Sequence, residues 1–111
     1  MMPQEAKELS IEVWTYLAEH PECEQKKNLP LELYEQIELM PGQCPLCKLY
    51  MYKHFDRSAM SCGKQCPLYR CDRIGSAWDR WSNGVEVTRR EAAQEIVDKL
   101  KAWEPENRTE V

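Results

Sequence analysis

The stretch Cys44-Pro45-Leu46-Cys47, followed by Cys62-Gly63-Lys64-Gln65-Cys66-Pro67-Leu68-Tyr69-Arg70-Cys71, decides how this chain is built. It holds five of the six cysteines of the chain. The first residues of the chain lack the basic start and the apolar stretch of a secretion signal. Without such a signal, thiolates at this close spacing most often bind a tetrahedral metal ion. We therefore expect residues 44–73 to form a loop that a structural metal ion organises.

Zinc takes four soft ligands, so five clustered cysteines are one more than it needs. Cys44 and Cys47 have the two-residue gap that suits a tight turn, and 14 residues separate Cys47 from Cys62. Gaps of three and four residues follow, from Cys62 to Cys66 and from Cys66 to Cys71. The spacing predicts a zinc site of Cys44, Cys47 and Cys66, and it leaves open whether Cys62 or Cys71 is the fourth ligand.

Other uses of these thiols are also open. An iron–sulfur cluster binds to closely spaced thiolates too, and neighbouring Lys and Arg residues would offset its negative charge. A redox pair at Cys44 and Cys47 is less favoured, because that motif belongs at the strand-to-helix turn of a βαβ unit, and the sequence predicts no such unit. His20 and Cys23 could add ligands, although a lone cysteine is usually a small buried hydrophobe. We expect His54 to lie at the surface.

The composition predicts one small globular domain. The chain has 111 residues, of which 42% are apolar and 31% charged, and no apolar run approaches the roughly 20 residues that cross a bilayer. We expect a domain over residues 1–104, a flexible tail over 105–111, and a cytoplasmic location, where reduced thiols favour metal ligation over disulfides. The sequence has no phosphate-binding glycine-rich loop and no hydrolase or metalloprotease motif. We therefore expect a binding protein with no small-molecule substrate, not an enzyme.

Apolar residues at helical spacing predict a mainly α fold of about four helices. The first helix is expected over residues 4–19, and the second starts with Pro30 in its first position and ends before residue 41. Ser76 is the expected N-cap of a short helix through Trp81. Thr88 and Glu91 have the spacing of a capping box at the start of the last helix. Residues 49–55 fit a short strand or a helical turn, residues 58–73 an irregular loop, and we expect both C-terminal helices to pack back across the first.

The net charge of −4 conceals an uneven distribution. Residues 48–90 contain nine Lys or Arg and four Asp or Glu, whereas the remainder contains six basic and 15 acidic residues. A basic region on an acidic protein can bind an acidic protein or a nucleic acid. The alternative is that the acidic flanks fold back and neutralise the basic region.

Four residues within this basic region are candidates for partner binding. Trp78 and Trp81 would share one face of a helix, with Arg73 and Arg80 beside them, which suits base stacking or a protein anchor with basic support. The alternative is that both tryptophans lie in the core. Arg89, with its neighbour Arg90, falls in the first turn of the last helix, where positive charge opposes the helix dipole. This position suggests an acidic partner, or pairing with nearby carboxylates.

The order of these features resembles a loose group of small, uncharacterised proteins of bacteriophages and prophages. The similarity extends from His20-Pro21 at the end of the first helix, through Cys44-Pro45-Leu46-Cys47 and the second Cys-Pro-Leu segment at residue 66, to the helix that contains residues 90–93. The three-residue gap between Cys62 and Cys66 departs from the pattern of the group. The resemblance implies metal binding and a phage-like origin.

Overall fold

Five α-helices and one short 3-10 helix form the part of the chain that the computed structural model describes, residues 2–40, 43–50, 67–68 and 74–105. Within these residues there is no strand, so the mainly α prediction is confirmed, with one helix more than expected. In chain order the elements are α1 (Pro3–Glu19), η1 (Lys26–Asn28), α2 (Leu31–Ile37), α3 (Pro45–Tyr50), α4 (Ala77–Asn83) and α5 (Glu86–Ala102).

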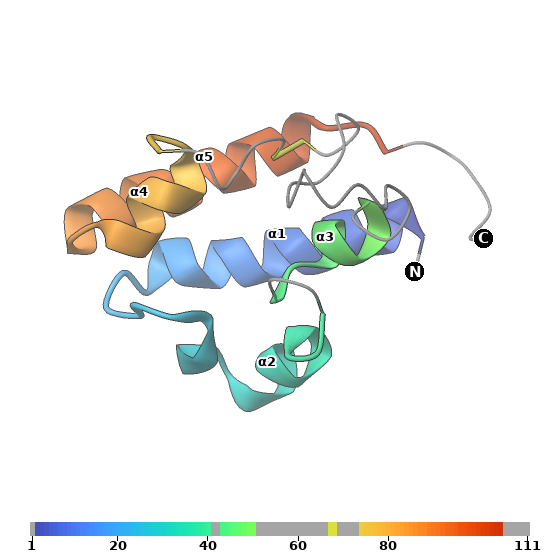
Figure 1. Ribbon diagram of the computed structural model, residues 1–111, viewed down its shortest axis with the longest axis horizontal. Coiled ribbons are helices and arrows are strands. Elements are labelled where there is room, and N and C mark those ends of the chain that lie inside the picture. The colour runs from blue at the N-terminus through green and yellow to red at the C-terminus, as the bar shows by residue number, and fades with distance from the viewer. Residues whose placement is uncertain (1, 41–42, 51–66, 69–73, 106–111) are drawn as a thin grey trace.

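The two long helices, α1 and α5, lie side by side and run in opposite directions (Figure 1). Small side chains allow this close approach, because Ala6 on α1 and Ala92 and Ala93 on α5 are almost completely buried. At one end of the pair, Lys7 Nζ donates to the carbonyl oxygen of Trp103 at 2.7 Å, which satisfies an acceptor at the C-terminus of α5. The larger buried side chains of the pair are Leu9, Val13, Trp14, Leu17, Ile96, Val97 and Leu100.

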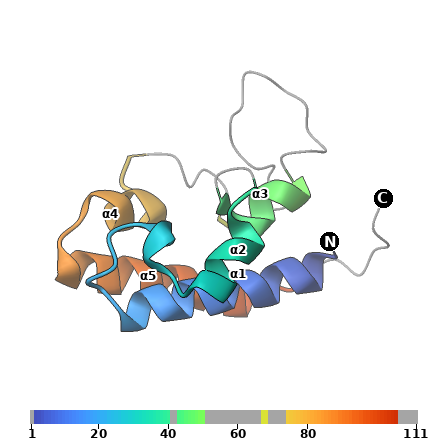
Figure 2. The same cartoon turned by 90° about the horizontal axis from the view of Figure 1, so that it is seen from below.

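The shorter helices α2, α3 and α4 lie on one side of this pair (Figure 2). Helix α4 packs on α5, and α3 packs on α1. Trp81 on α4 meets Trp14 on α1 in an edge-to-face contact, with 5.1 Å between the ring centroids and 84° between the ring planes. This contact joins α4 to the first helix, so the prediction that the C-terminal helices pack back across α1 is confirmed.

The helix starts test the predicted caps. Ser76 is the N-cap of α4 as expected, and its Oγ accepts from the amide of Asp79 at 3.0 Å. The capping box at Thr88 is wrong, because α5 begins at Glu86 with Val85 as its N-cap. The carboxylate of Glu86 in the first turn suits the positive end of the helix dipole, so the helix gains from starting three residues earlier than predicted.

The second helix starts one residue later than predicted. Pro30 is the N-cap of α2, and Leu31 is its first helical residue. Residues 45–50 form helix α3, so the helical alternative is confirmed where it overlaps the described residues. The rest of the expected loop, except residues 67–68, and the tail after residue 105 lie outside the described residues. No helix in the described part is long and apolar enough to cross a membrane.

Candidate metal centre

The first cysteine pair lies at the start of α3. Cys44 directly precedes the helix and Cys47 is in its first turn, while Pro45 takes the first helical position, where its missing N–H costs nothing. Leu46, between the two cysteines, is completely buried in the core beneath α3. Both cysteines are half-buried and pack against the core. Burial of Leu46 therefore fixes the Cys44–Cys47 segment to the core, and both cysteines lie at the start of α3, which packs on α1.

The electrostatics of Cys44 indicate that the two thiols are in contact. A hydrogen bond with the Cys47 thiol raises the pKa of Cys44 well above its ordinary value, and burial raises it further. The charge of Lys26 and the backbone amide of Cys47 act in the opposite direction and lower this pKa. Two neighbouring cysteine sulfurs are a donor pair that fits a soft cation, which binds them as thiolates after their protons are released.

The second Cys-Pro-Leu segment also contacts the core. Leu68 is partly buried and packs against the same hydrophobic cluster that contains Leu46. Cys66, two residues earlier, lies outside the described residues, as do Cys62 and Cys71. The structure thus places two of the five predicted ligands, and within its described part no group of three or more His, Cys, Asp or Glu residues is arranged to bind a metal ion.

His20 and Cys23 have internal roles. The His20 ring stacks on Tyr16 with 3.9 Å between the centroids, and its Nδ1 lies 3.0 Å from the Tyr16 carbonyl oxygen. Cys23 is 7% exposed and belongs to the core, as expected for a lone cysteine. Burial is the main cause that raises the pKa of the Cys23 thiol. Its place in the hydrophobic core is what separates Cys23 from the cysteine pair at α3.

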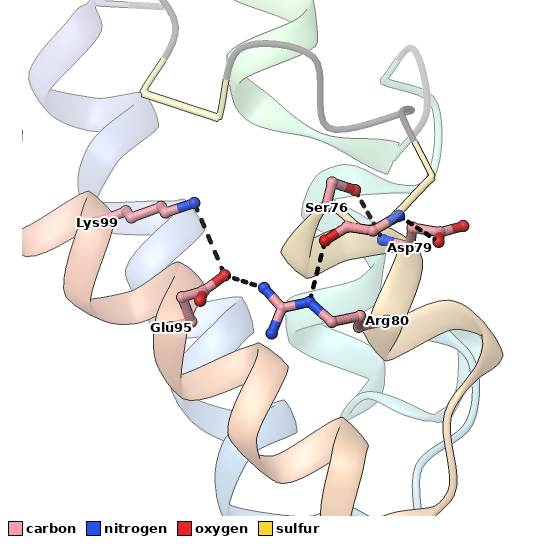
Figure 3. A network of polar contacts seen from close by, with 6 residues as sticks. Ser76, Asp79, Arg80, Glu95 and Lys99 are labelled. Atoms are coloured by element: carbon pink, nitrogen blue, oxygen red, sulfur yellow. Dashed lines mark hydrogen bonds and ion pairs between the residues drawn. The ribbon is translucent and has the colours of Figure 1, made fainter.

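The predicted partner-binding residues have different surroundings. Trp81 is 4% exposed and lies in the core, so it is not available to a partner, and the core alternative holds for it. Trp78 is partly buried against the same core. Arg80 forms an ion pair with Glu95 on α5, and its Nε donates to the Gly75 carbonyl oxygen at 3.2 Å (Figure 3). Arg73 lies outside the described residues.

Arg89 corrects the interpretation of the last helix. Its side chain is buried, its Nε donates to the Pro21 carbonyl oxygen at 2.7 Å, and its Nη1 donates to the Gly84 carbonyl oxygen at 2.6 Å. The residue therefore serves the fold and is not available to an external acidic partner. Arg90 is exposed, beside acidic residues of α5.

Sequence reasoning missed Lys26, which it placed in a charged connector. This lysine is 8% exposed and its Nζ donates to the carbonyl oxygen of Gln43, the residue before Cys44. No pattern in the sequence distinguishes it from its neighbour Lys27, which is exposed.

The chain was compared with protein-family models, with curated proteins and with solved structures, and none of them matches it.

Proposed function

We propose that the chain is a zinc-binding accessory protein of the phage type, in which a metal-organised basic loop binds an acidic protein or a nucleic acid in the cytoplasm. The observation that carries the proposal is the position of Cys44 and Cys47 at the start of α3, where both pack against the core. Cys66 and either Cys62 or Cys71 would complete a four-thiolate site. Such a site has no open coordination position, so the metal would stabilise structure and would not catalyse a reaction.

The packing of the two Cys-Pro-Leu segments supports this ligand set. Leu46 and Leu68 both contact the core, although they are far apart in the sequence. Each leucine follows a cysteine by two residues, Cys44 in the first segment and Cys66 in the second. A metal that joins the two segments would organise residues 58–73, which contain too few apolar side chains to form a core of their own.

The distribution of charge supports a binding role for the loop. Residues 48–73 contain six Lys or Arg and two Asp or Glu, a net charge of +4 when the cysteines are neutral. Four thiolates around Zn²⁺ add two negative charges, so the loaded loop stays basic. Arg80 and Arg89 are engaged within the domain, which leaves the partner-binding role to the basic residues of the loop and to Arg90.

An iron–sulfur or thiol redox protein is the competing function. A redox-active cysteine needs a lowered pKa, because the thiolate is the nucleophile. The raised pKa of Cys44 weighs against thiol redox chemistry at this residue. Anaerobic purification distinguishes the two metals, since a zinc–thiolate protein is colourless and an iron–sulfur protein is brown.

Elemental analysis of purified Cys44→Ser and Cys23→Ser proteins tests the metal centre. We expect about one zinc ion per chain in the wild type and in Cys23→Ser, and loss of zinc with a lower melting temperature in Cys44→Ser. Cys23→Ser is the matched control, because it changes the same atom in the core, away from the cysteine pair. Full zinc content in Cys44→Ser would refute the assignment of Cys44 as a ligand.

Chromatography on immobilised DNA distinguishes the two classes of partner. Retention of the zinc-loaded protein that weakens steeply with salt would support a nucleic acid, because phosphate contacts release counterions. No retention at low salt would assign the loop to an acidic protein.

A further inference from the structure

A surface groove of about 420 Å³ lies between α1 and α2, and we call it the α1–α2 groove. Three glutamates line it, Glu12 and Glu19 from α1 and Glu32 from α2, and none of its described lining residues is Lys or Arg. All three glutamates are exposed. Like charges around one groove add up in the potential that they create there, so the groove attracts positive charge.

The three carboxylates of the α1–α2 groove form no ion pair within the described part of the chain. The second groove, between α1 and α5, differs in this respect. Arg90 lies beside its acidic residues, Glu95 pairs with Arg80, and Asp98 accepts a hydrogen bond from Gln94 Nε2 at 3.0 Å. The groove between α1 and α5 thus neutralises part of its own charge, whereas the α1–α2 groove does not.

The surroundings of the α1–α2 groove add to its negative potential. Glu19 is the last residue of α1, and the last turn of this helix contains no basic residue, although the C-terminal end of a helix favours positive charge. Residues 1–47 contain nine Glu and three Lys, a net charge of −6. Of these lysines, Lys26 is buried and Lys7 donates to the Trp103 carbonyl oxygen, so two of the three are held within the fold.

Apolar surface accompanies the charge in this groove. Pro30 is exposed at its edge, Leu33 is buried below it, and the half-buried Tyr16 lines it with a ring that stacks on His20. A cation near an aromatic ring gains a cation–π attraction, and the stems of Lys and Arg side chains pack on apolar surface. A basic side chain therefore uses both features of the groove, whereas a simple metal ion would use only the carboxylates.

We infer that the α1–α2 groove is the docking site for a lysine- or arginine-rich segment of another protein. Basic side chains of that segment pair with Glu12, Glu19 and Glu32, and their stems pack on Tyr16 and Pro30. The inference goes beyond the proposed function and is independent of it, because it involves neither the cysteines nor the basic loop. The charge of the groove repels a nucleic acid, so the partner is a protein.

Binding of a fluorescein-labelled peptide of alternating arginine and leucine, followed by fluorescence anisotropy at about 0.15 M salt, tests the inference. We expect a triple variant with Glu12→Gln, Glu19→Gln and Glu32→Gln to bind the peptide about 10-fold more weakly than wild type, since it loses three exposed ion pairs of ordinary strength. Glutamine keeps the size of each side chain, so circular dichroism should show an unchanged fold. A peptide with glutamate in place of arginine should not bind.

A second triple variant separates the groove from the net charge of the protein. Glu24→Gln, Glu35→Gln and Glu38→Gln together remove the same charge from exposed positions outside the groove. This variant should bind the peptide within about 2-fold of wild type, because salt screens distant exposed charges. Equal weakening in the two triple variants, or no binding to wild type, would overturn the inference.

Amide NMR spectra recorded during titration with the unlabelled peptide locate its site. The largest chemical-shift changes should fall in residues 12–19 and 30–36, and changes centred elsewhere would overturn the inference. Sedimentation of the protein alone tests a second copy as the occupant. A concentration-dependent dimer that the groove variant abolishes would assign the groove to self-association and overturn the assignment to another protein. Zinc content, which tests the proposed function, should be the same in both triple variants.

Discussion

Arg89 joins three segments of the chain through a single side chain. It extends from α5 to the Pro21 carbonyl oxygen after α1 and to the Gly84 carbonyl oxygen after α4. Both bonds are charge-assisted, and the residue is 7% exposed, so water cannot readily replace them. The side chain thus stabilises a junction between helices that the backbone hydrogen bonds of each helix leave unconnected.

We expect Arg89→Met to lower the free energy of unfolding by about 3 kcal/mol, because it leaves two acceptors without their charged donor. Urea denaturation followed by tryptophan fluorescence measures the change. Arg90→Met is the control, since it removes the same charge from an exposed neighbour and should change stability by no more than about 0.5 kcal/mol. Equal effects of the two substitutions would contradict the role of Arg89.

The buried charges are the part of the site that the sequence predicts least well. Lys26 and Arg89 each stand beside a residue of the same type that is exposed, Lys27 and Arg90. Burial of a charged side chain depends on which carbonyl groups the fold brings to it, and two of these, at Gln43 and Pro21, lie far away in the sequence. In contrast, the contact between Cys44 and Cys47 follows from local spacing, and it was predictable.

At the scale of helices, the corner between α4 and α5 depends on the absence of a side chain at Gly84. Its φ is −91°, which any residue can adopt, so conformational freedom is not the reason for glycine here. A Cβ atom at this position would lie 2.5 Å from the Arg80 carbonyl oxygen and 2.7 Å from Thr88 Cγ2. The two helices therefore approach each other too closely for alanine.

We expect Gly84→Ala to destabilise the protein by about 2 kcal/mol, because backbone and helix must shift to accept the methyl group. Gly75→Ala is an informative comparison. Gly75 has φ of +88° and nothing within 4 Å of a Cβ, so alanine there should cost only conformational strain, about 1 kcal/mol. Thermal unfolding of both variants gives the comparison, and a larger loss at Gly75 than at Gly84 would contradict the steric argument.

Periodicity predicted the helix interiors better than their ends. The apolar stripes of α1 and α5 extend over several turns, so the pattern is repeated and errors at one position do not matter. A helix start depends on a few local bonds. At α5 the N-cap Val85 makes no side-chain capping bond, and the local side-chain bond is the one from Arg89 to the Gly84 carbonyl oxygen. The sequence left residues 49–55 open between a strand and a helical turn. Helix α3 has only six residues, too few to distinguish the repeat of an α-helix from the alternation of a strand.

On the scale of the whole molecule, the core of α1, α4 and α5 is built without the cysteine pair. Its contacts are those of Trp14 with Trp81 and of the alanine-lined interface between α1 and α5. Helix α3 joins this core through Leu46, and among the long helices it packs mainly on α1. Loss of the metal should therefore affect α3 much more than the paired helices.

We expect zinc removal by a chelator to lower the melting temperature, by about 4–8 °C for each kcal/mol of stability lost, while most of the helical circular dichroism remains. Amide hydrogen exchange locates the change, since α1 and α5 should keep their protection and α3 should lose it. In a Cys44→Ser, Cys47→Ser double variant, the chelator should have no further effect. Simultaneous loss of protection in α1, α3 and α5 would mean that the metal holds the entire fold, because the helix pair could not then be stable by its own packing.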